Sequence, residues 1–204
     1  MRDLLDPVRS AWPGHGYSLI ELMFVLGLVA ILSGIVLPRL TAGVDELRTR
    51  GAARYLSARL QQTRMEAITR SVNAALRVTA VGSSFRYAVY LDGNRNGVRS
   101  LDIQRGLDRR LAGEERLRDQ FPGIDFGTLP DLPAVDGSSS PPGADPVRLG
   151  SSNMAAFTAE GTATPGSLYV LGPRNTQFVV RILGETGKTR ILRFDRRSGT
   201  WKPL

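Results

Sequence analysis

Few residues in this chain of 204 have side chains suited to catalysis. Cysteine is absent, which excludes a thiol nucleophile, a disulfide framework and a CxxC zinc site. His15 is the single histidine, and no serine, lysine or carboxylate stands at a spacing typical of a catalytic arrangement. Asp108, Glu114 and Glu115 lie in an arginine-rich polar segment, which is typical of ordinary surface ion pairs. We therefore predict that the chain is not an enzyme.

One loop carries residues suited to a cation site. Asp92, Asn94 and Asn96 place oxygen donors at alternate positions, and a glycine follows where a calcium loop turns sharply. Ile103, however, stands where an EF-hand-like loop needs a bidentate carboxylate. The same residues are also good turn formers after a strand. Calcium binding at Asp92, Asn94 and Asn96 is one interpretation, a simple turn is the other, and no other cofactor is expected.

The end of the chain is strongly basic. Residues 173–204 hold eight Lys and Arg side chains against two carboxylates, and the whole chain has a formal charge of +8. Such a patch can bind nucleic-acid phosphates without sequence preference. A turn near Gly187 would project Lys188 and Arg190 outward. A solvated face and a contact with a neighbouring subunit are the alternatives.

The first structural element that the sequence predicts is an apolar segment near the N-terminus. From Tyr17 to Pro38 the chain has 22 residues with one charge, Glu21. A helix of that length extends about 33 Å, so we predict a transmembrane helix over residues 17–38. The apolar run is too long for a secretory signal peptide, and the flanking charges do not orient it. Glu21 is costly there unless it meets a partner or reaches the membrane interface.

The residues after Pro38 predict a helix and then a β-rich domain. Residues 39–72 have apolar residues at three- and four-residue steps, which favours an amphipathic continuation of the helix whose stripe packs on a sheet rather than on a partner. The predicted stripe consists of Val44, Leu47, Gly51, Tyr55, Ala58, Gln62, Met65, Ile68 and Val72.

Residues 73–204 form the predicted β-rich domain. Strands are predicted over residues 75–79, 85–90, 167–171, 177–182 and 190–194. A flexible Gly/Ser/Pro-rich loop with little to pack is predicted at about 122–146. The fold class is therefore α+β, with a long N-terminal helix packed on a C-terminal antiparallel sheet domain.

A short string of residues at the start of the apolar segment is distinctive. Gly16-Tyr17-Ser18-Leu19-Ile20-Glu21-Leu22-Met23, with the uncharged run and Pro38, closely resembles the class III leader and N-terminal helix of type IV prepilins and type II secretion pseudopilins. The resemblance implies that a prepilin peptidase removes residues 1–16 and that Tyr17 is then N-methylated. It implies assembly roles for Glu21 and Pro38, with Glu21 able to pair with the terminal ammonium of an adjacent subunit.

The same resemblance implies a location. The chain would cross the bacterial inner membrane once, with its N-terminus in the cytoplasm and its C-terminal domain in the periplasm, and would later enter a filament. Its partners would be other pilins or pseudopilins, the prepilin peptidase and membrane lipid.

Features of the β-rich part narrow the resemblance further. The long helix followed by strands, together with Phe157–Thr162 and Gly187–Ile191, is similar to the GspH/FimT-type minor pseudopilins. This implies a pilin-like fold and a subunit at or near the tip of a type II secretion pseudopilus or type IV pilus. The turn through Lys188 and Arg190 resembles the motif by which some FimT-type pilins bind DNA, with Lys188 in place of an arginine. A DNA-binding minor pilin for DNA uptake is the alternative function.

Overall fold

The computed structural model describes residues 16–136 and 140–204, apart from the side chains of residues 34–42. The chain divides into two compact units, Met1–Thr41 and Ala42–Leu204. Helix α1 (Leu19–Arg70) contributes residues to both units and covers most of the two helical segments predicted between residues 17 and 72. Short helices α2 (Ser100–Gln104) and α3 (Leu117–Gln120) lie in the second unit.

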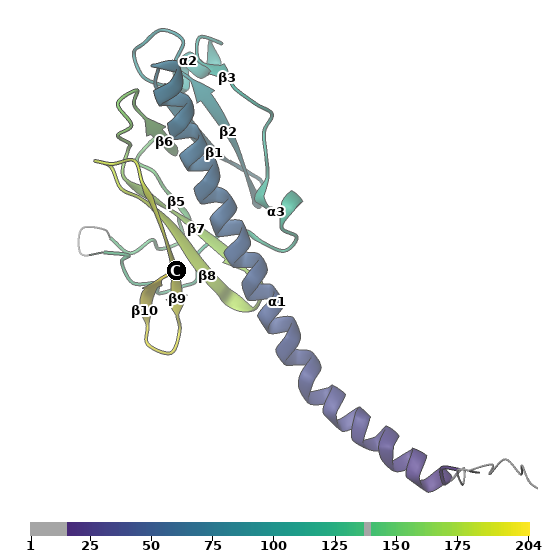
Figure 1. The fold of residues 1–204 in the computed structure, drawn as a ribbon. Coiled ribbons are helices and arrows are strands. Elements are labelled where there is room, and N and C mark those ends of the chain that lie inside the picture. Colours follow the sequence, from purple (N-terminus) through teal and green to yellow (C-terminus); the bar gives the residue numbers. More distant parts are fainter. Residues whose placement is uncertain (1–15, 137–139) are drawn as a thin grey trace, which may run out of the picture. The chain divides into compact units, whose positions relative to one another are not determined.

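Two antiparallel sheets make up the rest of the second unit (Figure 1). The first sheet has the order β3-β2-β1-β6, and the second has the order β10-β9-β8-β7-β4, with β5 also paired to β7. The first contains β1 (Ala74–Val81), β2 (Ser84–Leu91), β3 (Arg109–Arg110) and β6 (Met154–Phe157). The second contains β4 (Asp125–Phe126), β5 (Val147–Arg148), β7 (Gly166–Gly172), β8 (Thr176–Ile182), β9 (Thr189–Asp195) and β10 (Thr200–Pro203).

The predicted α+β class with a long helix and antiparallel sheets is confirmed. The five predicted strands correspond to β1, β2, β7, β8 and β9. Each of these five strands has seven or eight residues, whereas the strands that the sequence did not predict have two to four. Short strands offer too few residues for an alternating pattern to emerge.

The main core lies between α1 and both sheets (Figure 1). The predicted apolar stripe of α1 is wrong for Leu47 and Met65, which are 67% and 55% exposed, although Tyr55 of the stripe packs against the core. The helix instead buries a face of small and branched residues, namely Thr49, Ala52, Ala53, Leu56, Leu60, Thr63 and Ala67. The two threonines can be buried because their hydroxyls donate to backbone carbonyls one turn back, at 2.7 and 2.8 Å. The sequence pattern did not indicate this face, because Thr and Ala are less hydrophobic than Leu, Ile or Met and add little to an apolar periodicity.

Gly172 shows how closely α1 approaches the second sheet. A Cβ atom at this position would lie 2.0 Å from Oγ1 of Thr49, so only glycine fits at the end of β7. Small residues on the helix and the missing side chain on the strand therefore work together to set the spacing between helix and sheet.

The segment 122–146 has more structure than predicted. Leu129 and Leu132 are buried on the outer face of the second sheet, in a cluster with Tyr169, Val179 and Leu192. Trp201 closes the cluster, and its indole N–H donates to the carbonyl of Pro133 at 3.1 Å. The expectation that this segment has little to pack is wrong for its described first part, because two leucines spaced three apart cover an otherwise exposed apolar face. Residues 137–139 lie outside the described residues, and the flexibility of the loop stays a prediction.

Candidate assembly and binding surfaces

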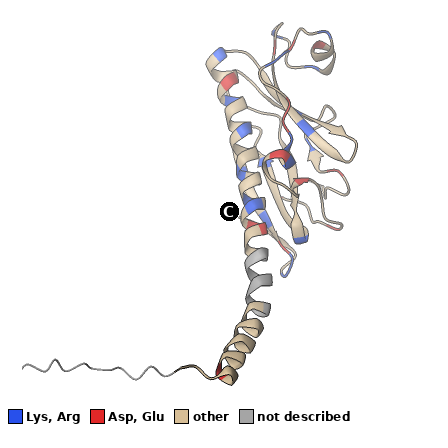
Figure 2. Cartoon of the chain, turned by 90° about the vertical axis from the view of Figure 1, so that its right-hand side faces the viewer, with Lys and Arg blue, Asp and Glu red and all other residues tan. Residues whose placement is uncertain are grey.

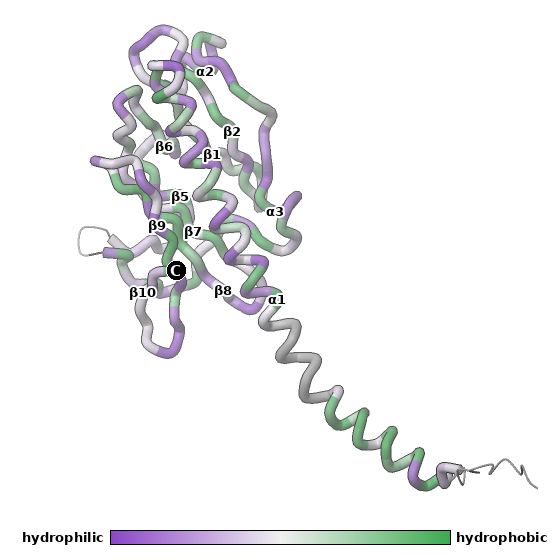
Figure 3. The backbone as a smooth tube through the Cα atoms, in the orientation of Figure 1, coloured by the Kyte–Doolittle hydropathy of each residue, from purple (hydrophilic) through white to green (hydrophobic). Residues whose placement is uncertain are grey.

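The first candidate surface is the apolar N-terminal part of α1. Residues 16–33 are all exposed, and most of them are large and hydrophobic (Figure 3). Glu21 lies in the first turn of the helix, where the helix dipole favours a negative charge. No hydrogen bond or ion pair joins its side chain to another described residue. This surface therefore presents apolar side chains and one carboxylate that has no partner in the described part of the chain.

The described residues include only parts of the predicted leader and membrane span. Gly16 and Tyr17 precede α1 and are exposed, while residues 1–15 of the predicted leader lie outside the described residues. The side chain of Pro38 also lies outside them, although α1 runs through its position. Within the described residues, no helix meets the length and hydropathy needed to cross a membrane. The transmembrane part of the predicted fold is therefore not confirmed.

The second candidate surface is the loop after β2, which is ordered around a buried carboxylate. Asp92 accepts hydrogen bonds from the backbone N–H groups of Asn94, Arg95 and Gly97, at 3.1, 2.7 and 2.7 Å, and from the side chain of Asn73 at 3.0 Å. Burial by itself raises the pKa of Asp92. These four donors outweigh burial and hold the pKa below its ordinary value.

Two further aspartates complete this loop. Asp102 accepts from the amide groups of Asn94 and Asn96 at 3.3 and 3.0 Å, and Asp108 accepts from the backbone N–H groups of Gly93 and Arg99 at 3.1 and 2.8 Å. Asp108, which the sequence placed among surface ion pairs, is buried, so that expectation is wrong.

The contacts of these three carboxylates are those of a turn. No group of three or more His, Cys, Asp or Glu side chains in the described chain is arranged to hold a metal. Calcium binding at Asp92, Asn94 and Asn96 stays a prediction.

The third candidate surface is the β8–β9 hairpin. Lys188 and Arg190 are both exposed, and neither side chain forms an ion pair with another described residue. Ile191, the next residue along β9, faces the other side of the sheet and packs against the main core. Leu192 is on the same face as Arg190 and is buried in the outer cluster. Figure 2 shows other Lys and Arg residues along the second half of α1 and in the β-rich unit.

Two glycine turns noted in the sequence meet at α1. The backbone carbonyl of Gly161 accepts from Nε of Arg64 at 2.8 Å, and that of Gly187 accepts from the amide of Gln61 at 3.0 Å. Gly187 has φ +61°, and a Cβ atom on it would lie 2.4 Å from the carbonyl oxygen of Gly161. Hydrogen bonds from α1 to these two turns therefore hold the β-rich part against the helix. The sequence of each turn alone does not indicate this contact.

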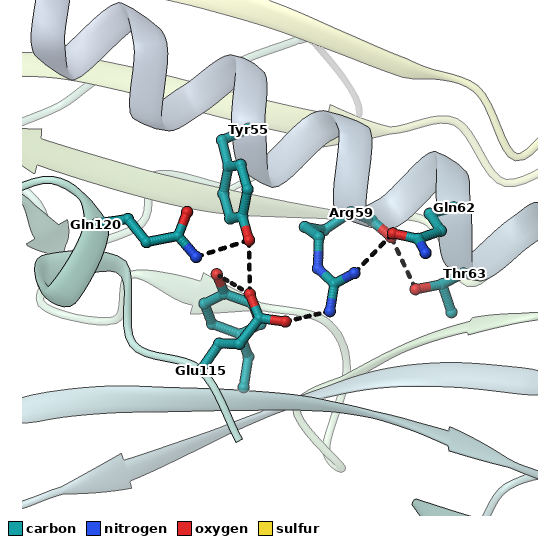
Figure 4. Close-up of polar contacts among 7 residues, drawn as sticks. Tyr55, Arg59, Gln62, Thr63, Glu115 and Gln120 are labelled. Carbon is teal, nitrogen blue, oxygen red and sulfur yellow. Dashed lines mark hydrogen bonds and ion pairs between the residues drawn. The ribbon is translucent and has the colours of Figure 1, made fainter. Parts of the chain in front are cut away.

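The sequence also did not predict a polar network around Glu115, between α1 and the first sheet (Figure 4). Glu115 accepts hydrogen bonds from the hydroxyls of Tyr55 and Tyr87, at 2.7 and 3.2 Å, and pairs with Arg59. Burial raises the pKa of the Tyr87 hydroxyl, and the negative charge of Glu115 raises it further. The expectation that Glu115 is an ordinary surface residue is wrong, because it joins α1 to the first sheet.

Comparison with known proteins agrees with the resemblance to pilins. No family model matches the chain. The pilin-like protein PilA1 of Thermus thermophilus is 36% identical over 82 residues, which are 40% of this chain and 51% of PilA1. Type II secretion system protein H of Xanthomonas campestris pv. campestris is 38% identical over 69 residues, which are 32% of this chain and 41% of that protein. The chain thus spans about half the length of the curated relatives it matches, or less.

Two solved structures of the minor pseudopilin EpsH from the type 2 secretion system of Vibrio cholerae are also similar. One has 16% identity and a TM-score of 0.44, covering 72% of this chain and 97% of EpsH. The other has 13% identity and a TM-score of 0.38, covering 79% and 95%. Scores this low do not establish a shared fold. Both sequence relatives are named as pilin or secretion-system proteins rather than as enzymes, in agreement with the prediction. Over less than half of its length, the chain is therefore similar to a pilin-like protein and to a type II secretion system protein H, in agreement with the resemblance noted in the sequence.

Proposed function

We propose that this chain is a minor pseudopilin or pilin subunit, assembled at or near the tip of a type II secretion pseudopilus or type IV pilus. The observation that carries the proposal is the exposed apolar surface of residues 19–33 with Glu21 in its first turn. An apolar surface of this length needs a non-aqueous environment. The bilayer supplies it before assembly, and the helices of neighbouring subunits supply it in the filament.

The proposal includes a sequence of steps for the N-terminus. A prepilin peptidase cuts between Gly16 and Tyr17 on the cytoplasmic side of the inner membrane, and the new N-terminal residue is methylated. Residues 17–38 then anchor the subunit as a single span, with residues 39–204 in the periplasm. On assembly, the carboxylate of Glu21 pairs with the terminal ammonium of an adjacent subunit, which neutralises both charges in an apolar environment.

Processing is tested by the mass of the protein extracted from membranes. We expect a mature chain that begins at Tyr17, and we expect Gly16→Leu to block cleavage because the peptidase must approach the backbone closely before the scissile bond. An N-terminus at any other residue in the wild type would contradict the prepilin proposal.

Assembly is tested by cross-linking the Glu21→Ala variant to other pilin subunits. We expect leader removal and membrane extraction to be unchanged and cross-linking to be lost. Glu66→Ala is the matched control, because Glu66 is a carboxylate on the same helix that already pairs with Arg70 at 2.7 Å. Undiminished cross-linking of Glu21→Ala would mean that Glu21 only reaches the membrane interface.

A DNA-binding minor pilin is the second candidate function. The observation that favours it is the exposure of Lys188 and Arg190. By contrast, Arg174 and Arg181 pair with Asp45 and Asp136, at 3.2 and 3.1 Å.

Duplexes of unrelated sequence test this second function. The double variant Lys188→Ala with Arg190→Ala should weaken binding equally for all of them and flatten the salt dependence by about one unit per lost contact. Arg105→Ala with Arg109→Ala is the matched control, because it removes the same charge from two exposed arginines that form no ion pair with another described residue. Equal losses in the two double variants would indicate an effect of net charge, and no gel shift at low salt would exclude this function.

A further inference from the structure

A basic groove lies on the second sheet, away from Lys188 and Arg190. It has a volume of about 630 Å³ and is lined by residues of β8, β9, β10 and the 3₁₀ turn η1 (Pro173–Asn175). Five cationic side chains line it, and Asp195 is the one carboxylate among its lining side chains. The cationic residues are Arg174, Arg193, Arg196, Arg197 and Lys202.

Part of this charge is compensated within the chain. Arg174 and Arg193 pair with Asp45 and Glu46 on α1, at 3.2 and 2.6 Å, and Lys202 pairs with Asp195 at 2.5 Å. The side chains of Arg196 and Arg197 are exposed and form no ion pair with another described residue. The groove therefore keeps two uncompensated guanidinium groups beside three compensated cations, which is an environment suited to an anion.

The chemistry of the lining favours a phosphate group attached to an apolar molecule. Guanidinium groups bind phosphate oxygens in a bidentate manner. Phe194, Pro203 and Leu204 add apolar surface to the same groove. Its volume is that of a small-ligand site, between about 300 and 1,000 Å³. A phospholipid headgroup with its glycerol carries both kinds of surface.

The groove is tethered close to the end of the predicted membrane span. Asp45 and Glu46, which hold two of its arginines, follow Pro38 by seven and eight residues. Eight residues span about 12 Å as a helix and at most about 29 Å when extended. The length of the chain therefore keeps the two carboxylates that hold Arg174 and Arg193 within about 29 Å of the end of a membrane span over residues 17–38.

We propose that this groove binds the phosphate headgroup of an anionic phospholipid while the subunit is in the membrane, before it enters a filament. This inference rests on the membrane anchoring in the proposed function. Headgroup binding holds the β9–β10 hairpin against the bilayer surface, and assembly into a filament must release it. Juxtamembrane arginines strengthen contact with anionic membranes by about five-fold each, so Arg196 and Arg197 together account for about 25-fold.

The absence of cysteine permits a direct test with the full chain. A fluorophore on Ser198→Cys, in the β9–β10 turn, reports contact with lipids that carry a headgroup nitroxide quencher. The chain is placed in nanodiscs of phosphatidylcholine alone or with about 30% phosphatidylglycerol. We expect at least two-fold stronger quenching in the anionic discs, and no difference for a fluorophore on Ser83→Cys in the β1–β2 turn.

Two double variants separate a specific site from net charge. Arg196→Gln with Arg197→Gln should remove the difference between the two kinds of disc, whereas Lys188→Gln with Arg190→Gln, which removes the same charge at the other end of β9, should leave it. Equal quenching in both discs, or equal loss in both double variants, would overturn the inference.

Further arms of the experiment identify the occupant. Inorganic phosphate or a short DNA duplex is added to the anionic discs. If inorganic phosphate releases the hairpin from the lipid surface only when its concentration is far above that of the lipid, the result would support a headgroup site. Release by a stoichiometric amount of duplex would overturn the lipid assignment in favour of DNA. A chain that fails to enter the discs would overturn the membrane anchoring and this inference together, whereas entry without quenching would overturn this inference alone.

Discussion

The two halves of α1 are both helical but differ in what surrounds their side chains. Residues 19–33 expose leucine, isoleucine, methionine and phenylalanine to solvent. Residues 49–67 bury a face made largely of alanine, threonine and leucine against two sheets. The difference shows that hydrophobicity and burial are separate properties of a helix. Large apolar side chains suit a bilayer or other helices, whereas small ones permit close packing on a sheet within one subunit.

The largest effect that would test this contrast comes from the same substitution in each half. Leu56 is fully buried in the core, so Leu56→Ala should lower the free energy of unfolding of the second unit by about 2–5 kcal/mol. Leu26 is 59% exposed, and Leu26→Ala should change it by less than about 0.5 kcal/mol. Thermal or denaturant unfolding, followed by the fluorescence of Trp201, measures both. A similar loss of stability in the two variants would contradict the proposed difference between the two halves of α1.

A second substitution tests how the buried half of α1 is fastened. Gly187→Ala introduces a side chain at φ +61°, where its Cβ would also meet the carbonyl of Gly161 and the side chain of Arg64. We expect a loss of about 1–3 kcal/mol in the free energy of unfolding. Gly199→Ala is the matched control, since φ there is +64° but the space around it is open, and it should cost about 1 kcal/mol or less. Equal losses would mean that only the backbone angle matters and that the turn does not need its close approach to α1.

The sequence predicted the elements of this fold better than their contacts. Long strands such as β7 and β8 have an apolar pattern that is independent of their neighbours. The buried face of α1 could not be found in the same way. Thr49 and Thr63 can be buried because their hydroxyls donate to their own helix, and Thr49 also needs the missing side chain of Gly172 opposite it. Such a face depends on what lies opposite, which a single sequence does not contain.

The sequence likewise predicted some residues of the candidate sites and missed others. Lys188 and Arg190 are exposed, as the turn near Gly187 predicted. Glu115 was assigned to the surface, because its partners Tyr55, Arg59 and Tyr87 are 28 to 60 residues away in the sequence. Long-range polar contacts leave no periodic pattern, so only the folded chain shows them.

A third prediction concerns this long-range network. Glu115→Gln keeps the size of the side chain but removes the charge that pairs with Arg59 and accepts from two tyrosines. We expect a loss of about 1–2 kcal/mol in the free energy of unfolding of the second unit. Glu114→Gln is the control, because Glu114 forms longer ion pairs at the surface, at 3.3 and 3.4 Å, and should cost less than about 0.5 kcal/mol. If both variants are equally stable, the network does not hold the first sheet to α1.

The smallest expected effect concerns Asp92 and acid. Burial raises the pKa of Asp92, but its hydrogen bonds outweigh burial and hold the pKa below its ordinary value in the folded chain, so folding favours the ionised form. The resulting stability is fully present above the unfolded pKa, about 3.9, and is lost as the pH falls through the lower pKa of the folded state. Unfolding of wild type and Asp92→Asn should therefore differ by about 1 kcal/mol at pH 7, with the difference shrinking below about pH 4. Asparagine is uncharged and has one acceptor oxygen in place of two, so it cannot accept all four hydrogen bonds that Asp92 accepts. A difference that stays constant from pH 7 to pH 2 would show that the Asp92→Asn substitution disturbs the loop by shape rather than by charge.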